Sequence, residues 1–185
     1  MSSRKYKDDY KIISSTDERG REKRVASYLG NYYEVSLNQE ELLKFKRLSF
    51  LLLITAFCLH LAGGFVDNQG MYQFFISLPY VIAFFPMIKI GEAIFRIPTE
   101  KRGYRRDEKE LSFDQIKTSS YVLIGILGIG LIGEIVFLLL ISADGQQDFE
   151  YRYLLLELVV ASCTLIMIRL VRPITFQIVP GSQEE

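Results

Sequence analysis

The stretch SSYVLIGILGIGLIGEIVFLLLIS, residues 119–142, decides the fold of this chain. It contains one charged residue, Glu134, and it is long enough to cross the hydrocarbon core of a membrane, which takes a helix of about 20 residues. Three more apolar stretches of similar length cover about residues 48–66, 71–95 and 151–171. Four such runs separated by polar segments predict an integral membrane protein with four spanning helices.

The composition fits a chain in which apolar and charged residues are segregated. Of the 185 residues, 49% are hydrophobic and 24% are charged, with 22 basic and 22 acidic side chains. This balance gives no indication of a nucleic-acid partner. One histidine and two isolated cysteines exclude a zinc site of ordinary spacing and a CxxC redox centre, and they leave haem without paired ligands. We therefore expect no catalytic residues, no metal and no cofactor.

The distribution of Lys and Arg predicts the orientation in the membrane. Eleven precede the first apolar stretch and seven lie in the loop 96–118, whereas the connections 67–70 and 143–150 hold none. By the positive-inside rule, both termini and the loop 96–118 face the cytosol, and we expect the plasma membrane as the location. The short outer connections pair the helices as hairpins. Residues 38–172 are thus predicted to form an all-α, antiparallel four-helix transmembrane bundle.

The cytosolic segments are predicted to contain a little β-structure. Residues 1–24 are dense in charge and serine, and we expect a disordered tail. In residues 25–37 apolar side chains alternate around Gly30-Asn31, which predicts a β-hairpin. Apolar residues alternate again in the C-terminal tail, residues 173–185, and we expect a strand there to join the hairpin in a small sheet. Such a sheet would lie under the helices on the cytosolic side.

Three ionisable residues are predicted to share one layer inside the membrane. His60, Glu134 and Glu157 each lie six to eight residues from the outer end of a predicted helix, about 9 to 12 Å below the boundary. Two neighbouring carboxylates cannot both ionise cheaply, and His60 could share a proton with them. The layer is therefore a candidate binding site. The alternative is that these groups are hydrogen-bonded structural contacts between helices.

Two further groups of charged residues lie toward the cytosolic side. Lys89 and Glu92 are three residues apart on one helical face and can neutralise each other, and snorkelling of Lys89 is the alternative to a ligand site. The basic residues of the central loop are predicted to contact lipid headgroups: Lys101, Arg102, Arg105 and Arg106. The simpler interpretation of this loop is that it only sets the topology.

These features predict a non-catalytic accessory or scaffold subunit of a membrane assembly. Its partners would be the lipid bilayer and either another protein or further copies of the chain. The alternative is a homo-oligomeric transporter, coupled to protons or cations through Glu134 and Glu157. An enzyme acting on lipid through Glu92 and the cluster Arg102–Arg106 would lack a nucleophile.

Overall fold

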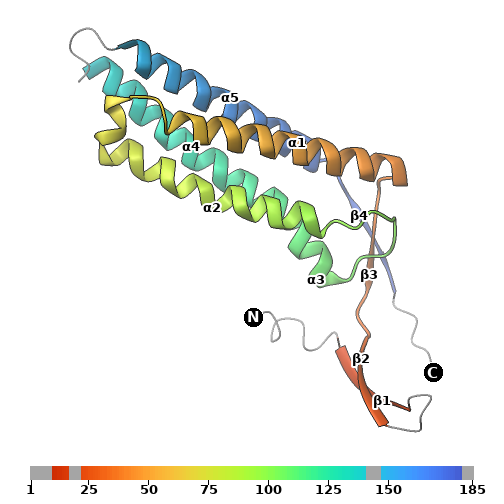
Figure 1. Cartoon of the computed structure of the whole chain (residues 1–185). Helices are drawn as coiled ribbons and strands as arrows, with labels where there is room; N and C mark the ends of the chain where they lie inside the picture. The colour runs from red at the N-terminus through yellow and green to blue at the C-terminus, as the bar shows by residue number, and fades with distance from the viewer. Residues whose placement is uncertain (1–9, 17–21, 141–146, 181–185) are drawn as a thin grey trace.

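The computed structural model describes residues 10–16, 22–140 and 147–180. The described chain is mostly helical, with two small sheets at one end. Its four long helices are α1 (Gln39–Gly63), α2 (Phe74–Arg96), α4 (Gln115–Leu140) and α5 (Gln147–Val171). They lie side by side (Figure 1), with α1 and α4 each packed against both α2 and α5. The helices enclose a large apolar core and a smaller second cluster made of Ile76, Phe137 and Tyr153.

Three helical segments are long and apolar enough to cross a membrane: Phe74–Arg96, Arg106–Leu140 and Asp148–Val171. Each of the four long helices also exposes large apolar side chains to its surroundings, among them Leu51, Phe85, Ile132 and Leu155, all more than 60% exposed. A water-soluble protein rarely leaves so much apolar surface uncovered. The surface pattern is that of a protein whose helices face lipid.

Helix α1 begins well before its apolar part, directly after the N-cap residue Asn38. Asn38 Oδ1 accepts the backbone N–H of Glu41 at 2.8 Å, and the Glu41 carboxylate accepts the N–H of Asn38 at 2.9 Å. This reciprocal capping box satisfies two backbone donors that a helix start leaves open. Because the helix starts at this cap, the charged residues that precede the apolar part of α1 are helical.

The segment predicted as a loop over residues 96–118 is helical in its second half. The short helix α3 (Arg106–Lys109) and the π-helical turn η3 (Glu110–Asp114) lead directly into α4. The Glu108 carboxylate caps this start by accepting the backbone N–H of Arg105 at 3.1 Å. The extended part of the loop is thereby reduced to residues 97–105.

One of the two sheets connects the N-terminal segment to the C-terminal segment. β1 (Tyr10–Thr16) pairs antiparallel with β2 (Glu22–Tyr28), and β3 (Tyr32–Val35) pairs antiparallel with β4 (Phe176–Val179). In the second sheet Tyr32 lies opposite Val179. The predicted pairing of a C-terminal strand with the N-terminal segment is thus present.

The strands nevertheless differ from the predicted hairpin of residues 25–37. β2 pairs with β1, which lies inside the segment 1–24 that was predicted to be disordered. Gly30-Asn31 therefore connects two different sheets and does not form the turn of a hairpin. The physical reason is that both edges of β3 are occupied. One edge pairs with β4, and on the other Tyr33 exchanges two backbone hydrogen bonds with Tyr104, at 2.8 and 2.9 Å. Residues 1–9 and 17–21 of the predicted tail lie outside the described part of the chain.

Candidate functional site

His60 and Glu157 form a direct contact inside the helices. His60 is fully buried and Glu157 nearly so, and the His60 Nδ1 atom lies 2.8 Å from Glu157 Oε1. The other ring nitrogen, Nε2, lies 3.0 Å from the carbonyl oxygen of Tyr80 on α2. The Tyr80 hydroxyl in turn donates to the carbonyl oxygen of His60 at 3.0 Å. Two of the three predicted layer residues are therefore brought together, and Tyr80, which the sequence did not single out, completes the group.

The partners of the imidazole determine how many protons the pair holds. Since a carbonyl oxygen only accepts, Nε2 must carry the proton that it donates to Tyr80. Nδ1 then either accepts a hydrogen bond from a protonated Glu157 or donates one to an ionised Glu157. In both forms the pair is neutral and shares a single proton along the Nδ1–Oε1 contact. A neutral buried pair avoids the large cost of an isolated charge.

The space around this pair is small. His60, Pro79, Tyr80, Gly130, Tyr153 and Glu157 line it, together with three apolar residues of α4. The cavity measures about 10 Å³, which is room for about one water molecule. The arrangement can hold or relay a proton, but it has no room for an organic substrate.

Glu134 does not join His60 and Glu157 but belongs to a second buried group nearer the end of the helices. Its Oε1 accepts a hydrogen bond of 3.3 Å from Asn68 Nδ2, and its carboxyl group interacts with that of Glu150. Glu150 Oε1 accepts the backbone N–H of Gln69 at 2.8 Å. Asn68, Glu134 and Glu150 are all at least 97% buried. The predicted single layer is thus divided into two groups, with Tyr153 within electrostatic reach of both Glu134 and Glu157.

The second group is closed by the connection between α1 and α2, which includes the 3₁₀ helix η2 (Gln69–Tyr72). A Cβ atom at Gly70 would lie 2.8 Å from Glu134 Oε2 and 2.8 Å from Asn68 Oδ1. Glu134 Oε2 and Glu150 Oε2 have no hydrogen-bond partner among the described residues. A larger residue at position 70 would require the Glu134 carboxyl group and the Asn68 amide group to shift.

A signal for Glu150 was available in the sequence. Glu150, Tyr153 and Glu157 are spaced by three and four residues, which places them on one face of a helix. The predicted helix began at residue 151, whereas α5 begins at Gln147 and includes Glu150 in its first turn. The error of four residues at this boundary hid the stripe. Asn68 and Tyr80 carried no comparable signal.

The charged residues at the other end of the helices pair with one another. Lys89 Nζ and Glu92 Oε2 form an exposed ion pair of 2.9 Å. Arg102 and Arg105 both contact Glu108, at 2.7 and 3.1 Å, and Arg106 contacts Glu110 at 3.1 Å. The backbone N–H of Lys101 donates to the side chain of Gln39. Three of the four side chains predicted to contact lipid headgroups are therefore already bound to carboxylates.

No protein-family model matches the chain, and neither curated proteins nor solved structures match it. Within residues 10–16, 22–140 and 147–180, no three His, Cys, Asp or Glu side chains gather as ligands for a metal ion. The function must therefore be inferred from the geometry described above.

Proposed function

We propose that all four long helices cross a membrane in antiparallel order, with β3, β4 and the loop 97–105 together on the cytosolic side. Paired strands must lie on the same side of a membrane, so the chain between β3 and β4 must cross it an even number of times. That interval contains the three helical segments that are long and apolar enough to span, together with α1. A fourth crossing, by α1, makes the number even.

Two other observations support a crossing by α1. The backbone bridge between Tyr33 and Tyr104 encloses only α1 and α2, so these two helices must also cross as a pair. The outer face of α1 carries exposed apolar side chains as far as its last turn, including Phe50, Ile54 and Leu61. Such a face is suited to lipid. The distribution of Lys and Arg supports the cytosolic side for the paired strands.

Within this membrane placement we infer a non-catalytic accessory or scaffold subunit. The observation that carries this conclusion is the contact of His60 with Glu157 around a cavity for one water molecule. Buried polar side chains that bind each other hold helices in register and leave no site for a substrate. The cytosolic end, built from β3, β4 and Tyr104, offers a folded surface to a protein partner.

The topology is tested by cross-linking the two strands. Glu34 and Gln177 lie directly opposite each other, so Glu34→Cys with Gln177→Cys, in a background of Cys58→Ser and Cys163→Ala, should form a disulfide in native membranes. A membrane-impermeant maleimide should label Gln73→Cys in intact cells, but reach Glu34→Cys only after permeabilisation. Labelling of both positions from outside would contradict the four-span topology.

The scaffold role is tested by native mass spectrometry of protein gently extracted from its own membrane. A stoichiometric protein partner is expected, and Phe176→Ala, which weakens the cytosolic end, should release it. Glu157→Gln should retain the partner. A homo-oligomer without any other protein would contradict the scaffold role.

The 2.8 Å contact between His60 Nδ1 and Glu157 Oε1 is the observation that favours a second candidate, a proton-coupled transporter working as a homo-oligomer. Proton uptake into vesicles containing the purified protein should then be lost in Glu157→Gln and retained in Glu92→Gln, which changes an exposed carboxylate. Uptake that survives Glu157→Gln would exclude this pair as the coupling site.

A further inference from the structure

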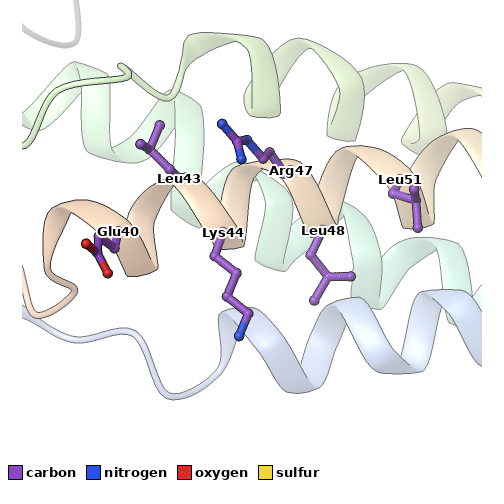
Figure 2. Close-up of a pocket in the computed structure, with 6 residues that line it drawn as sticks. All are labelled: Glu40, Leu43, Lys44, Arg47, Leu48 and Leu51. Carbon is purple, nitrogen blue, oxygen red and sulfur yellow. The ribbon is translucent and has the colours of Figure 1, made fainter.

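Helix α1 carries an open groove on its outer side, close to its cytosolic end. The groove measures about 570 Å³ and is lined by Glu40, Leu43, Lys44, Arg47, Leu48 and Leu51 (Figure 2). These six residues recur at intervals of one, three and four, so they form one helical face. From Glu40 to Leu51 the face extends for roughly 16 Å along the helix. It is large enough for part of an amphiphilic molecule.

The chemistry of the groove changes along the helix. Lys44 and Arg47 lie toward the cytosolic end, are exposed, and form no ion pair with any residue that the structure describes. Figure 2 shows Arg47 and Lys44 extending to opposite sides of α1, so the two cations flank the groove. Beyond them, toward the membrane, the wall is made by Leu48 and Leu51.

The cations of this groove differ from their basic neighbours. Lys46, between them in sequence, donates its Nζ proton to the carbonyl oxygen of Ile97. The arginines of the central loop are bound to Glu108 and Glu110. The one acid of the groove, Glu40, lies at the far cytosolic end and only weakens the positive field. Lys44 and Arg47 thus leave a positive charge next to an apolar wall.

We propose that this groove binds an anionic phospholipid of the cytosolic leaflet, with its headgroup over α1, flanked by Lys44 on one side and Arg47 on the other, and with an acyl chain along Leu48 and Leu51. The proposal rests on the membrane placement proposed above. The order of the groove, cations outside and apolar wall inside, matches the order of headgroup and chain in a lipid. A guanidinium and an ammonium supply the charge-assisted donors that a phosphate accepts.

The test is a titration of the full-length protein in detergent, followed by native mass spectrometry. The probes are phosphatidylglycerol and phosphatidylcholine with identical acyl chains. The native protein should bind the anionic lipid more tightly. Lys44→Gln with Arg47→Gln should weaken that binding about 25-fold, since each basic residue near a membrane surface contributes a factor of about 5. Glu40→Gln should strengthen it severalfold.

The matched control is Lys117→Gln with Arg169→Gln. Both residues are exposed at the same end of the helices and lie outside the groove. Their substitution removes the same amount of charge as the substitution of Lys44 and Arg47. This control should bind phosphatidylglycerol as the native protein does. Equal losses in the two double variants, or equal affinity for the two lipids, would overturn the groove as a site. A protein bound there in place of lipid would also overturn it.

Membrane placement itself is measured separately, by extraction of cell membranes with alkaline carbonate. A protein that is released by carbonate is not integral, and the proposed function then fails together with the lipid site. A protein that stays in the membrane but shows no lipid preference refutes the lipid site alone.

Discussion

The Nδ1 atom of His60 lies 2.8 Å from Oε1 of Glu157, although the two residues are 97 positions apart in the chain. Because Nε2 of the same ring lies 3.0 Å from the carbonyl oxygen of Tyr80, one imidazole connects α1, α2 and α5. A side chain with two buried partners on two other helices fixes their relative height. The relative heights of α1, α2 and α5 should therefore be set in part by this ring.

Replacing Glu157 tests the energetic role of this contact. Glu157→Leu leaves Nδ1 of His60 without its partner and should lower the free energy of unfolding by about 1 to 3 kcal/mol. Glu157→Gln keeps a donor for Nδ1 and should cost less than about 1 kcal/mol. Unfolding in mixed micelles by added dodecyl sulfate measures both. Leu155→Ala, at an exposed position of the same helix, is the control and should behave like the native protein.

Gly70 and Gly128 are predicted to respond in opposite directions to alanine. A Cβ at Gly70 would lie 2.8 Å from Glu134 Oε2, so Gly70→Ala should destabilise by about 1 to 3 kcal/mol through overpacking. A Cβ at Gly128 would meet nothing within 4 Å, and Gly128→Ala should stabilise α4 by about 0.5 to 1 kcal/mol. The same micellar unfolding assay applies. A stable Gly70→Ala protein would show that the turn does not rest on the Glu134 carboxyl group as described.

The folded protein should become more stable when the hydroxyl group of Tyr104 is removed. The ring is fully buried, and its hydroxyl has no hydrogen-bond partner among the described residues. Removing an unsatisfied buried polar group should make Tyr104→Phe about 1 kcal/mol more stable at neutral pH. Tyr80→Phe, which removes a hydrogen bond to His60, should be less stable than the native protein.

The pH dependence of Tyr104 provides a second measurement. Burial raises the pKa of Tyr104 from 10.0 to about 12, against the opposing charge of Arg102. Because the folded protein holds this proton more tightly, its contribution to stability is complete below pH 10.0 and is lost as the pH rises to about 12. The native protein should therefore lose stability over this interval more steeply than Tyr104→Phe. Parallel curves would contradict the burial of the hydroxyl.

Phe176 should be the most sensitive position of the sheet formed by β3 and β4. Its ring centroid lies 5.2 Å from that of Phe113 and 6.5 Å from that of Tyr104. Because the ring is only partly buried, Phe176→Ala should cost about 1 to 3 kcal/mol, less than a fully buried Phe. Limited proteolysis should then cleave faster around β3. Ile178→Ala, at a position that is 63% exposed, should leave the cleavage rate unchanged.

Much of the helical architecture could be predicted from the sequence because apolar runs of sufficient length have few alternatives in a membrane. The pairing of a C-terminal strand with the N-terminal segment also followed from a local pattern, the alternation of apolar residues. The pairing partner of β2 could not be predicted from local patterns. The choice between β1 and β3 depends on Tyr104, which is distant in sequence and occupies an edge of β3.

The candidate site was predicted only in part, for a geometric reason. Counting residues from helix ends gives the depth of a side chain but not its direction around the helix. His60, Glu134 and Glu157 were therefore assigned to one layer, whereas Glu134 turns toward Asn68 and Glu150. In the same way, the sequence predicted headgroup contacts for Lys101, Arg102, Arg105 and Arg106 but did not reveal that Glu108 and Glu110 bind three of these side chains.

The pairing of β3 with β4 also determines when the protein can be completed during its synthesis. β3 leaves the ribosome before any of the long helices, and β4 follows all of them. In the proposed topology, β3 remains on the cytosolic side until β4 emerges, with the backbone groups of one edge unpaired and open to the wrong strand. In that topology, the β3–β4 sheet forms late, and only after every preceding helix has been inserted correctly. A chain with one failed insertion would keep an open strand, which cellular quality control could recognise.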